Sequence, residues 1–291
     1  MLVETLVGAG ALAGALGVYA AGVEPLLEPR IRRYRIQSER FDFLRHRNGK
    51  SLHIAVIADL HACRLWMDSE RIHRIVAQTN ALNPDLIVLL GDYVSAVWPK
   101  EWSNPPLEAW SAPFSGFQAP LGTFAVLGNH DCRWDSTDVT LHLEKAGIPV
   151  LHNRAIELRT AAGAHLWLAG LGDQRVKHLG SGRYLGEDDL AGTMEQIKGE
   201  TDPLILLAHE PDIFPEVPSR VDLLLSGHTH GGQVRLPGLG TRFIPSRHGP
   251  RYVYGHFVED GRQMIVSGGL GCSKLPIRFR MPPEIGLIEI G

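Results

Sequence analysis

The chain has few cysteines and no large excess of either charge. Its 291 residues include 3 cysteines, Cys63, Cys132 and Cys272, too few and too scattered for a disulfide framework. An odd number leaves at least one thiol free, which favours a reducing compartment. The formal net charge is -3. Because binding to nucleic acid depends on a basic surface, this charge predicts no nucleic-acid partner.

Repeats of fixed period and low-complexity tracts are also missing, so the sequence is not that of a solenoid or a disordered chain. Hydrophobic residues make up 44% and charged residues 21%, an ordinary globular composition with enough apolar residues for a large core. The length suits one large α/β domain or two small ones.

Charged residues are absent from Thr5 to Val23. As a helix, this stretch would be about 28 Å long, close to the thickness of a hydrocarbon core. We interpret residues 1–25 as a transmembrane anchor, followed by a basic linker over 26–50. Two alternatives stay open: a cleaved signal peptide with Val18-Tyr19-Ala20 as its cleavage site, and a buried helix of the globular part.

Arginines flank this apolar segment on one side only. Seven of them lie between residues 30 and 47, and none precedes the segment. By the positive-inside rule, the domain over 51–291 is expected on the cytoplasmic side of a bacterial inner membrane. The arginine-rich stretch would suit contact with anionic headgroups. Export of the domain is the alternative.

Apolar runs of strand length alternate with helical patterns in the rest of the chain. A strand over 52–58, a helix over 68–82 and a strand over 85–90 form a predicted βαβ unit. Other strands are predicted at 123–127, 165–170, 204–208 and 221–225, and β structure near 233–236, 252–257, 263–267 and 285–290. Helices are predicted at 136–145 and 187–198, and a loop at 173–188. The predicted fold is a mixed α/β, partly parallel β-sandwich with helices on its outer faces.

Residues 93–121 combine 5 prolines with 6 aromatic residues. A segment of this composition predicts a long loop or an irregular cap. Aromatic loops near a site often shape the entry of a substrate. The alternative is that these aromatic side chains cover the edge of the sheet, and the sequence does not separate the two.

Polar side chains follow five of the predicted strands at the point where each strand ends. Each of them alone has an ordinary explanation as a helix cap, a turn or a satisfied polar residue. Open α/β sheets bind their ligands at the carboxyl ends of strands, so five such ends in one chain predict a site. The residues are Asp59 and His61, Asp92, Asn129 and His130, His209, and His228 and His230.

These side chains have the chemistry of metal ligands. Imidazole and carboxylate groups without cysteine suit divalent ions such as Mn, Fe or Zn. Apart from His130, four histidines, two aspartates and an asparagine are too many donors for one ion and enough for two that share a bridging ligand. Two ions about 3.5–4 Å apart suit in-line displacement at phosphorus.

The chain carries, in this order, the motifs Asp-x-His, Gly-Asp, Gly-Asn-His-Asp, a strand-end His and Gly-His-x-His. With these motifs it resembles the calcineurin-like metallophosphoesterase family. The resemblance runs from about residue 52 to the carboxyl terminus. It implies a four-layer α/β/β/α sandwich around a dinuclear metal centre. The ligands it implies are Asp59, His61 and His230 for the first ion, Asn129, His209 and His228 for the second, and Asp92 as the bridge.

The same resemblance implies the catalytic groups. A hydroxide bridging the ions would attack phosphorus, and His130 would donate to a phosphoryl oxygen or protonate the leaving group, oriented by Asp131. Arg64 and Arg133 follow two of the motifs closely, and we expect them to contact a substrate phosphate. The chain departs from the family in lacking the acidic residue that many members carry shortly after the bridging aspartate. That residue is not a ligand, so the predicted ligand set stands.

An apolar amino-terminal segment followed by this compact domain resembles the membrane-associated bacterial phosphodiesterases, some of which cleave the pyrophosphate of UDP-2,3-diacylglucosamine in lipid A synthesis. We therefore expect a phosphodiesterase or pyrophosphohydrolase loaded with Mn and acting on a lipid-linked substrate. The aromatic loop and apolar, basic stretches at 236–245 and 251–254 favour it. The alternatives are a phosphodiesterase on soluble or cell-envelope phosphodiesters and a non-catalytic membrane scaffold.

Overall fold

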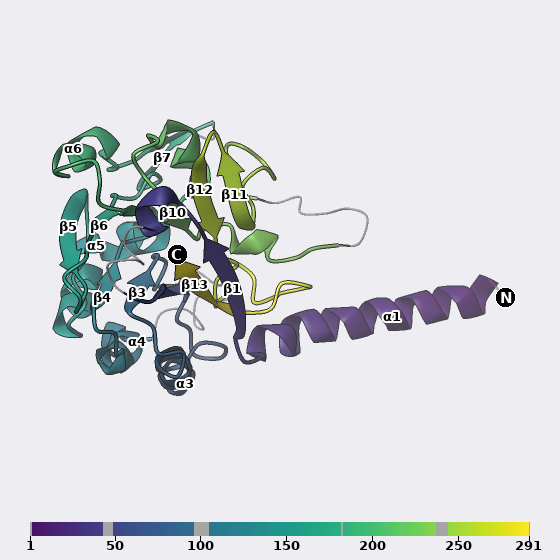
Figure 1. The fold of residues 1–291 in the computed structure, drawn as a ribbon. Coiled ribbons are helices and arrows are strands. Elements are labelled where there is room, and N and C mark those ends of the chain that lie inside the picture. Colours follow the sequence, from purple (N-terminus) through teal and green to yellow (C-terminus); the bar gives the residue numbers. More distant parts are fainter. Residues whose placement is uncertain (1, 43–48, 96–104, 182, 237–243, 291) are drawn as a thin grey trace.

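In a computed structural model, two β-sheets pack face to face with helices on the outside (Figure 1). The structure describes residues 2–42, 49–95, 105–181, 183–236 and 244–290. Parallel strands form the centre of both sheets. The predicted mixed α/β sandwich is confirmed.

The first sheet has five strands in the order β1-β13-β2-β3-β4. Its central strands are continuous apolar runs, which is typical of parallel strands covered on both faces. β2, β3 and β4 run parallel, and β13 pairs antiparallel with β2. The bounds are β1 (Arg30–Ile36), β2 (Leu52–Ile57), β3 (Leu86–Leu89), β4 (Thr123–Ala125) and β13 (Glu284–Ile290).

The second sheet has six strands in the order β11-β12-β10-β9-β6-β5, with parallel pairing from β12 through β6 and antiparallel strands at both edges. A separate ribbon pairs β7 with β8. The bounds are β5 (Arg154–Arg159), β6 (His165–Gly170), β7 (Lys177–Gly180), β8 (Arg183–Leu185), β9 (Leu204–Leu207), β10 (Leu223–Ser226), β11 (Gly255–Glu259) and β12 (Arg262–Val266).

Alternation along the strands divides the core into layers. On β2, Ile54 and Val56 belong to a cluster between the two sheets, whereas Ala55 and Ile57 belong to a cluster on the outer face of the first sheet. This division follows from the two-residue period of a strand. Helices α3 (Ser69–Asn80), α4 (Leu107–Ser111) and α5 (Asn129–Lys145) cover that outer face, and α6 (Leu190–Glu195) with the short helix η4 (Pro211–Glu216) contacts the outer face of the second sheet.

The helix between β2 and β3 is specified locally. The Asp68 side chain accepts a hydrogen bond from the backbone N–H of Arg71 at 2.8 Å and so caps the first turn. Ile72, Ile75 and Val76 follow at helical spacing and are buried against the sheet. α3 therefore returns the chain to the amino end of β3, which makes β2 and β3 parallel.

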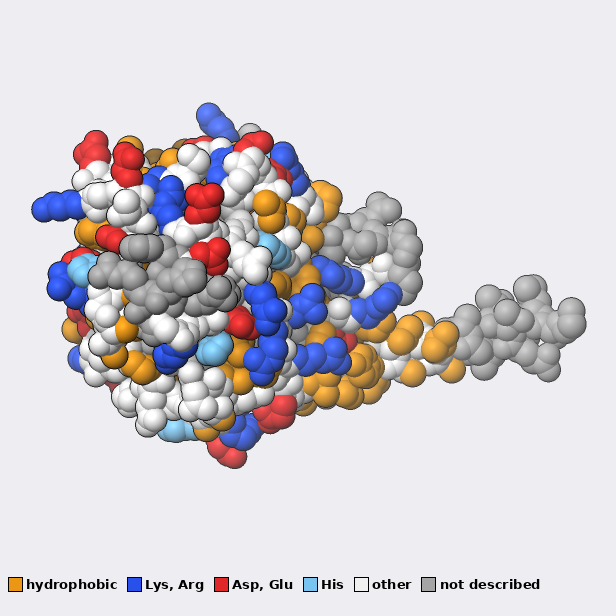
Figure 2. Space-filling model, in the orientation of Figure 1, with side chains coloured by type: hydrophobic (Ala, Val, Ile, Leu, Met, Phe, Trp, Pro, Cys, Tyr) orange, Lys and Arg blue, Asp and Glu red, His pale blue; other side chains and the backbone are white. Residues whose placement is uncertain are grey.

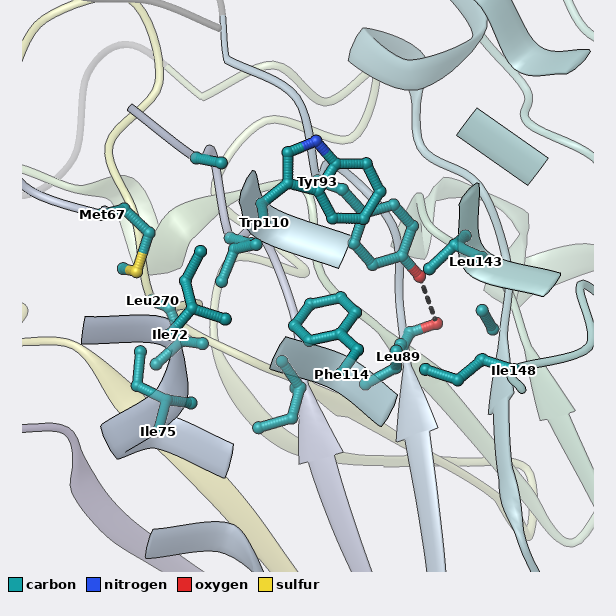
Figure 3. Packing of buried hydrophobic residues seen from close by; sticks show 14 of the residues in the cluster. Met67, Ile72, Ile75, Leu89, Tyr93, Trp110, Phe114, Leu143, Ile148 and Leu270 are labelled. Atoms are coloured by element: carbon teal, nitrogen blue, oxygen red, sulfur yellow. Dashed lines mark hydrogen bonds between the residues drawn. The ribbon is translucent and has the colours of Figure 1, made fainter. Parts of the chain in front are cut away.

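Aromatic residues from the 93–121 segment pack into the cluster on the outer face of the first sheet (Figure 3). The rings of Tyr93 and Trp110 stack 5.4 Å apart at an interplanar angle of 10°, and Phe114 meets both rings edge-on. The Tyr93 hydroxyl donates to the carbonyl of Leu89 at 3.2 Å. These described residues cover the sheet, which agrees with the alternative that the aromatic side chains of the segment cover a sheet edge. Trp98 and Trp102 lie outside the described residues.

Replacing Trp110 with alanine should lower the free energy of unfolding by about 3–5 kcal/mol, because a fully buried ring is removed from a close-packed cluster. Denaturant titration measures the change. Trp134 is 52% exposed, and its replacement by alanine is the matched control, expected to shift stability by less than about 0.5 kcal/mol. Equal effects of the two substitutions would contradict the packing described here.

The predicted membrane anchor is wrong. The segment forms α1 (Leu2–Gly22), which projects from the sandwich (Figure 1), but no helix among the described residues is long and apolar enough to cross a membrane. The last turn of α1 is bonded to the domain. The backbone N–H of Arg278 donates to Ala20, and the Trp66 indole donates to Ala21. The predicted placement in a bacterial inner membrane depended on this anchor and is corrected with it.

The predicted basic linker also differs from the structure. Within it, Arg30–Ile36 forms β1, which pairs with β13 in parallel over its whole length. Its four arginines are exposed, and Figure 2 shows Lys and Arg side chains gathered beside the base of α1. The arginines lie on both faces of this edge strand and are exposed to solvent, so the strand has the composition of a linker.

Two other expectations changed. The predicted loop at 173–188 contains the β7–β8 ribbon, and β5 was not predicted. The β structure expected at 233–236 is reduced to an isolated bridge between Val234 and Phe279. Most of the apolar stretch at 236–245 lies outside the described residues.

Candidate metal centre

The five polar strand ends meet between the carboxyl edges of the two sheets. β2, β3 and β4 bring the first three ends from one sheet, and β9 and β10 bring the other two from the second. All seven predicted ligands are buried, and His130 is partly buried. Two sheets that have parallel central strands and pack face to face can thus place their ligand-bearing edges around one point.

Glycine is needed where two of these ends touch. Gly91 has a φ of +92°, and a Cβ atom there would lie 2.4 Å from the backbone nitrogen of Gly128. A Cβ atom at Gly128 would lie 2.3 Å from Oδ1 of Asp92. These contacts are shorter than van der Waals distances, so neither position accepts a side chain without movement of the Asp92 carboxylate or its turn.

Backbone conformation is unusual at the predicted ligands. Five of the seven have positive φ values between 46° and 68°, a region that non-glycine residues occupy infrequently because of steric clashes. Such residues cluster at functional sites, where the surrounding fold holds them. The five are Asp59, His61, Asp92, His228 and His230.

One group of donors joins β2 to β10. Asp59, His61 and His230 place one ligand atom each within 4.8 Å of one another. The Nε2 atoms of the two histidines are 3.0 Å apart, and Nε2 of His230 lies 3.6 Å from Oδ1 of Asp59. Behind His230, the buried guanidinium of Arg278 places Nη2 3.4 Å from Nδ1.

A second group joins β3 to β9 and β10. Asp92, His209 and His228 also place their ligand atoms within 4.8 Å of one another. Oδ2 of Asp92 lies 3.2 Å from Nε2 of His209, and it is also 3.6 Å from Nε2 of His61 in the first group. Asp92 therefore lies between the two groups, where a bridging ligand would be.

Hydrogen bonds aim the lone pairs of three histidines into the centre. In each, the outward ring nitrogen is bonded to a backbone carbonyl, which fixes the proton there and leaves the inward nitrogen free to accept a metal. The pairs are His61 Nδ1 with Val94 at 3.1 Å, His209 Nδ1 with Leu90 at 2.6 Å and His228 Nε2 with Pro245 at 3.0 Å.

The Asn129 amide also suits a bound cation. Its oxygen faces Nδ1 of His228 at 2.9 Å, so two acceptors point at each other, while its nitrogen faces the guanidinium of Arg133. Hydrogen bonding alone would favour the amide turned by 180°. A divalent ion between the oxygen and the imidazole nitrogen favours the orientation seen, so the donors present fit metal ions.

Burial sets the protonation of the imidazoles. It lowers the pKa of His61 to about 3 and that of His228 and His230 well below the usual value. At His209 burial also acts to lower the pKa, but the Asp92 carboxylate outweighs it and raises the pKa well above the usual value. Neutral imidazole is the form that binds metal. Three of the four histidines therefore hold that form at neutral pH.

Metal affinity should rise as pH increases from about 5 to 7, by about tenfold per unit for each proton released. Burial raises the pKa of Asp59 to about 7, so its proton must leave before the carboxylate can bind an ion, and the raised pKa of His209 adds to this requirement. Calorimetric titration with Mn²⁺ in buffers of different ionisation enthalpy measures the affinity and the protons released. An affinity independent of pH would contradict this.

His130 lies beside this centre. Its Nε2 is 3.9 Å from Oδ2 of Asp92, its ring meets the His61 ring edge-on at 4.8 Å, and its side chain is 13% exposed. Asp131 does not orient it as expected. Its carboxylate accepts hydrogen bonds from the backbone N–H groups of Asp92, Tyr93, Val94 and Gly128. Asp131 thus fixes the turn that carries Asp92.

The two predicted arginines separate. Arg133 lies at the centre, where its Nη1 is 2.9 Å from the Asn129 amide and its Nη2 donates to the carbonyl of Arg175 at 2.9 Å. Arg64 is exposed and has no hydrogen bond or ion pair with any described residue. The structure therefore brings Arg133 to the site, whereas contact of Arg64 with a substrate phosphate stays a prediction.

Sequence reasoning missed the residues that follow β6. Asp173, His209 and Glu210 form another buried group with ligand atoms within 4.8 Å of one another, and Arg175 lies 3.4 Å from Nε2 of His228. The available signal was an apolar strand running into Gly172 and Asp173, as the other ends do. Arg278, far along the chain from His230, carried no signal.

A buried set of imidazole, carboxylate and amide donors between two parallel sheets defines a metal-dependent hydrolase site. Residues 52–232 match the family described as calcineurin-like phosphoesterase. The chain belongs to this family. It is a metallophosphoesterase, a hydrolase of phosphoester bonds that uses divalent metals.

Curated relatives agree with this assignment. Phosphodiesterase YaeI of Escherichia coli is 32% identical over 263 residues, which cover 86% of this chain and 88% of YaeI. Metallophosphoesterase YkuE of Bacillus subtilis is 32% identical over 76% of this chain and 73% of its own. A metallophosphoesterase of Aquifex aeolicus is 30% identical over 90% of this chain and 91% of its own.

Among solved structures, the NAD nucleotidase of Haemophilus influenzae aligns with a TM-score of 0.45 and 18% identity, covering 76% of this chain and 45% of that chain. A 5'-nucleotidase of Thermus thermophilus aligns with a TM-score of 0.42 and 11% identity, covering 75% of this chain and 48% of that chain. The chain thus spans about half the length of these enzymes.

Proposed function

We propose that the chain hydrolyses phosphodiester bonds with two divalent ions held between the carboxyl edges of its sheets. The observation that carries the proposal is the pair of donor groups that meet at Asp92, with inward lone pairs on three imidazoles. The proposed ligands are Asp59, His61 and His230 for one ion, Asn129, His209 and His228 for the other, and Asp92 for both. Mn is the proposed metal, with Fe or Zn as alternatives.

When bound, the ions supply positive charge that polarises the phosphoryl group and activates a nucleophile. The remaining chemistry falls to side chains. His130, beside Asp92 and partly exposed, would donate to a phosphoryl oxygen or protonate the leaving group. Arg133 would offset the negative charge on the phosphoryl oxygens from its position against Asn129. Asp131 would hold the Asp92 turn in place.

A phosphodiester is proposed because YaeI, of which 88% aligns, is named a phosphodiesterase. Lipid-linked pyrophosphates such as UDP-2,3-diacylglucosamine are a second candidate. It is supported by two exposed leucines on the β7–β8 ribbon, Leu179 at 48% and Leu185 at 55%. We further propose that the catalytic unit includes β1, because β1 completes the first sheet.

The test is a substrate panel on the purified protein loaded with Mn²⁺. Bis(p-nitrophenyl) phosphate, p-nitrophenyl phosphate and detergent-dispersed UDP-2,3-diacylglucosamine are compared by kcat/KM. Faster turnover of the diester than of the monoester is expected. Turnover of the monoester alone would overturn the proposal, and a rate on the lipid substrate no higher than on the diester would remove the second candidate.

A further inference from the structure

A cavity of about 570 Å³ opens beside the metal centre. Ligand pockets of about 300–1,000 Å³ hold small organic molecules. Two lining residues connect the cavity with the metal centre. Glu210 directly follows His209 in the chain, and the carbonyl of Pro245 is hydrogen-bonded to Nε2 of His228. Its lining includes Arg175, Arg183, Tyr184, Glu210, Asp212 and Arg247.

The β7–β8 ribbon and the segment before it bring two unpaired cations to this cavity. Neither Arg175 nor Arg183 forms an ion pair with any described residue, and Nε of Arg175 is buried without a hydrogen-bond partner. A buried guanidinium nitrogen without an acceptor costs free energy, which a bound anion would recover. The third arginine, Arg247, is paired with Glu216 at 2.9 Å.

Three of the four carboxylate oxygens of the two acidic residues at the cavity accept hydrogen bonds from protein groups. Asp212 accepts hydrogen bonds from the Ser246 hydroxyl and from the backbone N–H of Arg247 at 2.8 Å. Glu210 accepts through Oε2 from the backbone N–H of Gln174 at 3.2 Å, and its Oε1 is buried without a hydrogen-bond partner among the described residues. Neither carboxylate pairs with Arg175 or Arg183, so the two guanidinium groups remain available to an anion.

Arg175 is held in place between the centre and the cavity. Its guanidinium carbon lies 4.0 Å from the centroid of the Tyr184 ring, and Nη1 donates to the carbonyl of Pro245 and lies 3.4 Å from Nε2 of His228. Arg133 is bonded to the Arg175 carbonyl. A fixed guanidinium loses little conformational entropy when an anion binds.

We propose that this cavity binds a second phosphate of the substrate, with Arg175 and Arg183 as its ligands. Preferred substrates would then be phosphodiesters that carry a further phosphoryl group on one of their two alcohol components. Guanidinium groups suit phosphate because they donate two parallel hydrogen bonds to it. This inference rests on the proposed phosphodiesterase function and names a substrate class for it.

The test uses a matched substrate pair on the Mn-loaded protein: thymidine 5'-(p-nitrophenyl phosphate) with and without a 3'-phosphate. We expect kcat/KM to favour the 3'-phosphorylated substrate by about tenfold or more, the range of one charge-assisted hydrogen bond. Arg175→Gln and Arg183→Gln should each remove most of that preference. Lys177→Gln is the control, because Lys177 is exposed on the same ribbon but does not line the cavity.

Equilibrium binding gives a second readout that needs no turnover. Thymidine 3',5'-bisphosphate should bind more tightly than thymidine 5'-monophosphate, and the difference should fall in both arginine variants at unchanged metal content. Equal kcat/KM and equal affinity for the paired compounds in the wild-type chain would overturn the inference. If neither substrate is hydrolysed while the binding difference persists, the proposed reaction fails and the phosphate site stands.

Discussion

Replacement of His130 by alanine should lower kcat on a phosphodiester by about 10²–10⁴-fold, the usual contribution of a general acid. Unlike the predicted ligands, whose side chains are sealed from solvent, the His130 side chain is 13% exposed, and it lies 3.9 Å from the Asp92 carboxylate. It is therefore placed to meet a substrate that sits on the metal ions. Metal content should be unchanged, because the predicted ligand set is complete without it.

Kinetics on bis(p-nitrophenyl) phosphate and metal analysis of the same sample separate these effects. His152 is the matched control, since its side chain is 47% exposed and lies outside the predicted site, and His152→Ala should retain the wild-type rate. A His130→Ala variant with wild-type kcat would remove His130 from the mechanism. A loss of rate that tracks a loss of metal would instead make His130 a ligand.

The second large effect is expected from Asp92→Asn, which removes a charge at nearly constant shape. Oδ2 of Asp92 lies 3.2 Å from His209 and 3.6 Å from His61, one residue from each donor group. Loss of this carboxylate should release at least one ion and lower kcat/KM by about 10³-fold or more, since a metal ion supplies several kcal/mol to such reactions and each 1.36 kcal/mol is about tenfold.

Metal per chain, measured by emission spectroscopy, and kcat/KM check this result together. Asp138→Asn is the control, because Asp138 is 48% exposed on α5 and lies outside both donor groups. If Asp92→Asn kept two ions and the wild-type rate, Asp92 would not be the bridging ligand.

The central strands and the gathering of their ends were predictable because both follow from local pattern. Short apolar runs without alternation indicate buried parallel strands, and parallel strands in one sheet present their carboxyl ends at one edge. Asp59, Asp92 and Asn129 follow three such strands of the first sheet. The sequence therefore predicted which side chains would meet, although not their distances.

Elements whose stability depends on distant partners were missed. β1 is rich in arginine, and its partner β13 begins at Glu284, so no local pattern marks it as a strand. Arg175 lies just before the β7–β8 ribbon, whose exposed residues resemble a loop. Asp131 bonds to backbone N–H groups, and residue type alone does not distinguish that role from the orientation of a histidine.

The left-handed backbone at five of the predicted ligands bears on how this site can change in evolution. A non-glycine residue held there costs about 1–2 kcal/mol, and asparagine or glycine costs less. Mutations such as His228→Gly or His230→Gly would thus remove a ligand while relaxing the local backbone. Purifying selection on stability cannot eliminate them, so only selection on turnover keeps the centre intact. A duplicated copy released from that selection would drift toward a well-folded pseudoenzyme.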